Sequence, residues 1–171
     1  AFVDYKHAEL EGNKEASTFT NDSYNVRMEL TFGGNNVLPN QKDHPLSFNG
    51  VIGFSEENNK TIIAGEEAGY IPSFDQSSEA LYIIQNIEHS NLIFEVAARL
   101  ERNKLNPKVI KLKEKNKNNG SYSIGGGLRL SDNALIGVSI SKNSRAPSIS
   151  EIYADGVHHD AGIYEKGNSL L

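Results

Sequence analysis

Two adjacent histidines, His158 and His159, lie near the C-terminal end of the 171-residue chain, and Asp155 and Asp160 flank them. Zinc accepts neutral imidazole and carboxylate ligands where no thiolate is present. The chain contains no cysteine, so any metal site in it has to use these side chains. The pattern predicts a metal-binding loop formed by His158, His159, Asp155 and Asp160. The plain alternative is that exposed histidines in a polar loop bind nothing specific.

Other polar positions are weaker candidates for chemistry. His7 and Glu9, and Glu66 and Glu67, could add metal ligands, but such residues are common in polar loops. The run of three glycines at 125–127 precedes no helix whose N-terminus could take a phosphate. No Ser-His-Asp order, pair of catalytic carboxylates or nucleophile elbow is present. We therefore expect no enzyme and no bound cofactor.

Composition narrows the function classes further. The net charge of -5 and the isoelectric point near 5.5 argue against a nucleic-acid partner, because there is no basic face to neutralise phosphates. No apolar run approaches the roughly 20 residues of a membrane-spanning helix. The first ten residues, AFVDYKHAEL, do not have the pattern of a signal peptide.

The elements that must position these residues are predicted by alternation of apolar and polar side chains. In residues 92–101, for example, one face of a half-buried strand would carry Leu92, Phe94, Val96, Ala98 and Leu100. Similar alternation predicts strands near residues 2–10, 20–32, 46–56, 78–88, 92–103, 120–131 and 134–143. One alternative is a long helix starting at Ser78, but the turn sequence HSN at 89–91 favours two strands.

The links between the predicted strands alternate in length. Those at 89–91 and 132–133 are short, whereas those at 57–77, at 104–119 and after Ser144 are long and polar; only 33–45 fits poorly. Outer-membrane barrels have short periplasmic turns and long external loops. We therefore predict an all-β fold, an antiparallel up-and-down meander that forms a partial transmembrane β-barrel of about seven strands. A soluble β-sandwich that acts as a binding module is the alternative of another class.

The C-terminal stretch SRAPSISEIYADGVHHDAGIYEKGNSLL resembles a segment of TonB-dependent outer-membrane receptors. The matching positions are Arg145, Ala146, Pro147, Ser148, Glu151, Tyr153, Ala154, Gly156, His158, Gly162, Tyr164, Glu165, Gly167, Asn168 and Leu170. Asp155 stands where asparagine is common, and His159 and Asp160 replace smaller residues. Upstream, DYKHAELEG, TFTNDSYNVRMEL, NGVIGF and YIPSF are similar to the branch of this family that takes up zinc.

The resemblance implies a location in the bacterial outer membrane and a role in importing a scarce nutrient, with zinc as the transported substrate. The runner-up substrate is a ferric siderophore or haem. Family members carry a signal peptide and a plug domain and close a barrel of about 22 strands. Residues 1–171 are therefore expected to be an internal barrel fragment without these parts. The implied partners are the plug, the TonB complex, and outer-membrane lipid and lipopolysaccharide, with the Lys-rich stretch 104–117 as a candidate lipopolysaccharide contact.

Three further expectations concern single residues. Pro147 cannot donate to a sheet ladder, so it should end regular pairing after the last strand. Arg145 is expected to serve structure, with lumen carboxylates or the plug as partners. The lumen-facing charged residues are expected to form a solvated barrel wall, and the alternative is that they form cross-strand ion pairs or plug contacts. They are Arg27, Glu29, Glu95, Arg99, Glu101 and Arg129.

Overall fold

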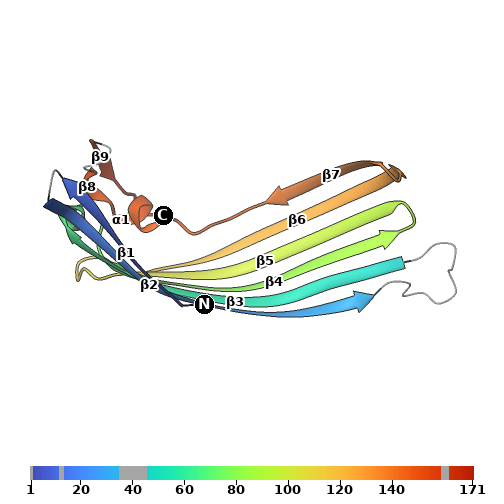
Figure 1. Ribbon diagram of the computed structural model, residues 1–171, viewed down its shortest axis with the longest axis horizontal. Helices are drawn as coiled ribbons and strands as arrows, with labels where there is room; N and C mark the ends of the chain where they lie inside the picture. Colours follow the sequence, from blue (N-terminus) through green and yellow to red (C-terminus); the bar gives the residue numbers. More distant parts are fainter. Residues whose placement is uncertain (1, 12–13, 35–45, 159–161) are drawn as a thin grey trace.

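The computed structural model describes residues 2–11, 14–34, 46–158 and 162–171. Its main element is one long, curved, seven-stranded antiparallel sheet in which each strand pairs with the next in sequence (Figure 1). The strands are β1 (Phe2–Glu11), β2 (Lys14–Gly34), β3 (Leu46–Gly65), β4 (Phe74–His89), β5 (Leu92–Pro107), β6 (Lys115–Ser131) and β7 (Ala134–Lys142). The predicted all-β meander is confirmed.

The β4–β5 connection decides between the two interpretations of residues 78–105. His89 pairs directly with Leu92, and Ser90 between them has a φ of 55°, so the chain reverses in a tight turn. The prediction of two strands is therefore confirmed, and the alternative of a long helix from Ser78 is wrong. Among the described residues, no helix is long and apolar enough to cross a membrane.

The two faces of the sheet differ in chemistry over part of its length. The register aligns even-numbered residues of β2 and β3, odd-numbered residues of β4 and even-numbered residues of β5 to β7 on the convex face. This face carries exposed apolar side chains, here called the apolar belt. Its members include Met28, Leu30, Ile52, Leu81, Ile83, Phe94, Val96, Leu100, Ile124, Leu128, Ile136, Val138 and Ile140.

The apolar belt approaches the height of the apolar band of an outer-membrane barrel. From Leu92 to Leu100 it follows β5 for roughly 27 Å, which a strand tilt of about 40° reduces to about 20 Å. Outer-membrane barrels carry an apolar band about 25 Å tall. The belt ends sharply: the next row beyond Leu81 and Leu100 consists of Glu56, Glu79 and Arg102 in register.

The strands continue well beyond the belt, on the side away from the short turns. β3 runs on to Gly65, β4 begins at Phe74, and β5 and β6 extend to Pro107 and from Lys115. The predicted polar loops 57–77 and 104–119 are therefore wrong in extent, and only 66–73 and 108–114 connect the strands. These strand ends carry mostly polar side chains on both faces, so no sustained alternation marks them, and their backbone hydrogen bonds hold them in the sheet. A contact of this Lys-rich stretch with lipopolysaccharide stays a prediction.

The chain after β7 folds back onto the concave side of this extension (Figure 1). It forms the short helix α1 (Ile149–Tyr153) and a hairpin of β8 (Asp155–His158) and β9 (Ile163–Lys166). Ile152 and Tyr153 pack in a small core with Phe74 and Leu105. The segment was expected as a polar loop, and its short apolar runs are too brief to predict this packing.

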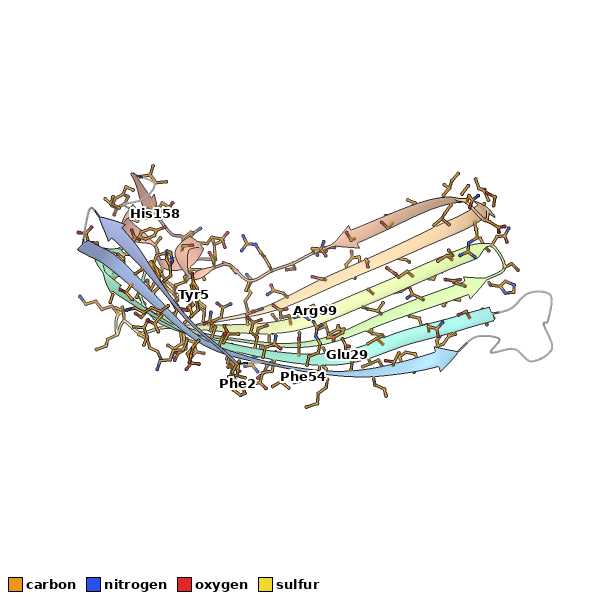
Figure 2. The ribbon with its side chains drawn as sticks, in the orientation of Figure 1. Phe2, Tyr5, Glu29, Phe54, Arg99 and His158 are labelled. Atoms are coloured by element: carbon orange, nitrogen blue, oxygen red, sulfur yellow. The ribbon has the colours of Figure 1, made fainter. Side chains whose placement is uncertain are left out.

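The same core identifies the concave face as the inner face of the sheet. Phe74 and Leu105 belong to the face opposite the apolar belt, so α1 lies inside the curve and the belt outside it. Figure 2 shows the arrangement, with Phe54 of the belt and Arg99 of the inner face labelled. An apolar outer face and a polar inner face are the pattern of a barrel wall with a hydrated lumen.

Candidate functional site

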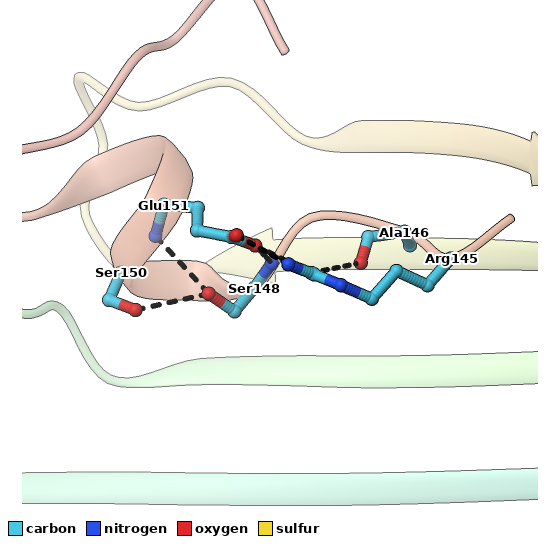
Figure 3. A network of polar contacts seen from close by, with 5 residues as sticks. All are labelled: Arg145, Ala146, Ser148, Ser150 and Glu151. Carbon is cyan, nitrogen blue, oxygen red and sulfur yellow. Dashed lines mark hydrogen bonds and ion pairs between the residues drawn. The ribbon is translucent and has the colours of Figure 1, made fainter.

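One carboxylate organises the start of the fold-back segment. Glu151 accepts two hydrogen bonds from the Arg145 guanidinium, at 2.6 and 2.7 Å, and one from the backbone N–H of Ser148 at 2.7 Å (Figure 3). In return, the Ser148 hydroxyl accepts the backbone N–H of Glu151 at 3.2 Å. This reciprocal pair is a capping box, which satisfies two donors at the start of α1.

These contacts correct two expectations about the segment. The bidentate bonds from Arg145 are the largest reason that the pKa of Glu151 falls to about 2, and the Ser148 N–H adds to the effect. Arg145 thus serves structure as expected, but its partner is Glu151 of its own segment and not a lumen or plug carboxylate. β7 ends at Lys142, so pairing stops well before Pro147.

The β8–β9 hairpin places the described ligand candidates on opposite faces. Successive residues of a strand point to opposite sides, so Asp155 and His158 cannot face the same ion while β8 is a strand. Asp155 accepts a hydrogen bond from the Tyr164 hydroxyl at 2.7 Å. His159 and Asp160 lie outside the described residues.

His158 lies in a cluster with Tyr70 and Glu165, which no motif in the sequence marks as site residues. Its ring stacks on Tyr70, with centroids 5.1 Å apart and planes 10° apart, and its Nδ1 lies 3.6 Å from Oε1 of Glu165. The Tyr70 hydroxyl donates a short hydrogen bond to the same carboxylate. Burial, and then this bond to Glu165, raises the pKa of Tyr70 to about 12, so the phenol keeps its proton.

The cluster joins two segments that are far apart in the chain. Tyr70 is only 5% exposed and follows the 3-10 helix η1 (Glu66–Gly69), whereas His158 and Glu165 belong to the hairpin. The backbone N–H of Asp155 donates to the Tyr70 carbonyl at 3.1 Å. A Cβ on Gly156 would lie 3.2 Å from the Tyr70 Cα, so glycine allows this close approach. Figure 2 shows His158 at this end of the sheet.

The weaker ligand candidates with described side chains do not complete a metal site with this cluster, and the side chain of Glu9 lies outside the part of the chain that the structure describes. Across the described ranges, no three His, Asp or Glu side chains gather in a geometry that could hold an ion. His7 lies in a ladder of rings, with centroids 6.3 Å from both Tyr5 and Phe19. Glu67 is buried, and its backbone N–H donates to the Ser17 hydroxyl at 2.9 Å.

The sequence does not predict the contact between Tyr70 and Glu165, because it forms only in the tertiary structure. Glu165 is opposite Gly156 in the hairpin, on the face of His158, and this register depends on where the turn falls. Gly162, with a φ of 62°, precedes β9 and is a local clue to the chain reversal. Tyr70 is separated from Glu165 by 95 positions, so no spacing rule could connect them.

The predicted lumen charges occupy the inner face, where Arg99 and Glu29 have defined polar partners. Arg99 pairs with Glu101 on its own strand at 2.6 Å, not across strands. Glu29 accepts the Tyr82 hydroxyl at 2.5 Å across β3. The defined ion pair thus lies within one strand, and the contact across strands is a Tyr–Glu hydrogen bond, so cross-strand ion pairs and plug contacts of these residues stay a prediction.

Comparison with known proteins agrees with this architecture. A family described as "TonB dependent receptor-like, beta-barrel" matches residues 3–171, nearly the whole chain. No curated protein matches the chain.

Proposed function

The chain belongs to the TonB-dependent receptor family, within its β-barrel, and from this premise we propose that the nutrient imported by its receptor is zinc. Members of this family are transporters of the bacterial outer membrane and not enzymes, and their barrels work with a plug and with TonB. The substrate is the part of the function that the family leaves open.

The observation that carries the zinc proposal is the setting of His158. Metal-binding histidines usually direct one ring nitrogen at a carboxylate, which orients the ring and raises the basicity of the other nitrogen. Glu165 faces Nδ1 of His158 in this way, and Tyr70 supports the ring from one side. Nε2 is then the nitrogen offered to zinc. The resemblance of the upstream stretches to the zinc-uptake branch supports the same substrate.

The proposed site is centred on His158 and completed by other groups. His159 and Asp160 follow it directly in sequence. Zinc bound by protein side chains takes about four ligands, so the plug or other loops of the receptor would supply the rest. Asp155 lies on the other face of the hairpin and would need a different local arrangement to contribute.

The test is zinc binding by the full-length receptor, measured by competition with a chromophoric chelator. We expect His158→Ala to weaken zinc affinity more than tenfold. Glu165→Gln should weaken it by roughly 10- to 100-fold, as loss of a supporting carboxylate typically does.

The matched control is His89→Ala, which removes a histidine at the opposite, short-turn end of the sheet. This variant should bind zinc as the unaltered receptor does. Unchanged affinity in His158→Ala would contradict the proposed site. TonB-dependent uptake of a ferric siderophore or haem, without zinc uptake, would replace zinc as the substrate.

A further inference from the structure

The side chain of Tyr82 lies over Gly53 on the inner face of the sheet. Glu29, Gly53, Tyr82 and Arg99 are successive register partners on β2, β3, β4 and β5. A Cβ on Gly53 would lie 2.2 Å from Cζ of Tyr82, so the ring occupies the space above Gly53 that any other residue would fill. From β4 it reaches across β3 and donates its hydroxyl hydrogen bond to Glu29 on β2.

Two guanidinium groups lie beside this ring. The Cζ atoms of Arg27 and Arg99 are each 5.9 Å from the Tyr82 ring centroid, within cation–π range. Arg99 is engaged by Glu101. Arg27 has no carboxylate partner among the residues that the structure describes, and Glu29, two positions along the same strand, is engaged by Tyr82.

The arginines and Tyr82 border a hollow of about 410 Å³. Toward β6 its lining becomes small and polar, with Ala97, Ser121 and Ser123, and Asn143 lies at its far side. Small side chains let another polypeptide approach the wall closely, and hydroxyl and amide groups can bond to its backbone. The hollow thus combines a surface that can bind the backbone of another polypeptide with the Arg27 guanidinium, which can bind a carboxylate.

The depth of the hollow determines what can enter it. Glu29 lies between Met28 and Leu30 of the apolar belt, so the hollow is on the lumen side of the wall at membrane depth. In this family the plug is the polypeptide that works with the barrel. Zinc is not a suitable occupant, because the guanidinium groups repel cations.

We propose that this hollow is a docking site for an acidic side chain of the plug. The carboxylate pairs with Arg27, since a guanidinium matches a carboxylate with two parallel hydrogen bonds. The Tyr82 ring holds Arg27 in position, and the adjacent plug backbone lies along Ser121 and Ser123. This contact is independent of the transported substrate.

The test is hydrogen exchange of the plug in the full-length receptor, compared between Arg27→Glu, Arg27→Gln and the unaltered protein. We expect roughly tenfold faster exchange in one acidic plug peptide for Arg27→Glu, and a smaller increase for Arg27→Gln, because losing a charged hydrogen bond lowers the cost of local opening. High salt should reduce the difference between the variants.

The matched control is Arg129→Gln, which removes an inner-face arginine that does not line the hollow. It should leave that peptide unchanged. Unchanged plug exchange in both Arg27 variants would overturn the proposal, as would an equal increase in Arg129→Gln. Impaired uptake with unchanged plug exchange would also overturn it and assign the hollow to a transported anion. If Arg27→Glu does not fold, Arg27→Gln alone decides among these outcomes.

Discussion

At the scale of single residues, Glu151 makes hydrogen bonds to three parts of the fold-back segment. Its carboxylate joins Arg145 to the Ser148 backbone, and its carbonyl accepts the backbone N–H of Asn168 at 2.7 Å. One residue therefore connects the end of the link after β7, the start of α1 and the chain after β9. These contacts hold the segment that presents His158.

The ionised state of Glu151 should make this segment sensitive to acid. Its pKa is lowered from 4.5 to about 2, so the ionised form is favoured in the folded state. The stabilisation is complete above the ordinary pKa of 4.5 and is lost as the pH falls toward 2. We expect protection of the Asn168 amide against hydrogen exchange to fall in this window, after correction for intrinsic rates.

Glu151→Gln provides the comparison for that experiment. It removes the titrating group and should lower protection of the Asn168 amide at neutral pH, with little further loss on acidification. Arg145→Lys keeps the charge but loses the bidentate hydrogen bonds. Its protection of the Asn168 amide at neutral pH should therefore lie between that of the unaltered protein and that of Glu151→Gln. Acid sensitivity that persists fully in Glu151→Gln would assign the titration to another carboxylate.

At the scale of elements, each strand has an apolar part and a polar part that meet at a defined row. In β3, Ile52 and Phe54 belong to the belt, whereas Glu56 and Asn58 on the same face do not. Lipid contact explains the first part, and water outside the membrane explains the second. The strand continues across this change because backbone pairing does not depend on side-chain polarity.

At this row, where the apolar belt ends, we expect a steep change in how much an added charge lowers the free energy of unfolding. Ile52→Arg lies inside the belt and should destabilise the receptor by about 2–4 kcal/mol, whereas Glu79→Arg, outside it, should cost about 0–1 kcal/mol. Denaturant titration of the receptor folded into lipid vesicles measures both values. Equal costs at the two positions would show that the convex face is not in contact with lipid.

At the scale of the whole molecule, the sheet is open and its outer surface is apolar. Among the described strands, β1 and β7 each pair on one side only, and the belt leaves Leu100 and Val138 69% and 74% exposed. Unpaired edges and apolar patches of this kind promote association in water. The surrounding barrel and membrane would cover both.

The isolated 171-residue chain should therefore require detergent. We expect it to sediment as aggregates in aqueous buffer and to disperse in detergent micelles, as measured by analytical ultracentrifugation. A monomer in water without detergent would contradict the expectation that the apolar belt needs a lipid or detergent cover. Its small core at α1 would be expected to persist in detergent, because Phe74 and Leu105 lie on the inner face.

The sequence by itself determined the meander and the faces of its strands. Period-two alternation reports which side chains share a face, and tight turns such as that at Ser90 report where the chain reverses, because both signals are local. The same alternation located the lumen charges and the apolar belt. It could not locate the strand ends beyond the belt, where both faces are polar.

Only the tertiary structure decided which polar residues meet. Tyr70 reaches Glu165, and Tyr82 reaches Glu29, through register and chain reversal over many residues. The adjacent histidines suggested a metal loop from composition, but the pleat of β8 separates His158 from Asp155 and turns it toward Glu165. Spacing along a chain does not encode such contacts, because they depend on the register and folding of several segments at once.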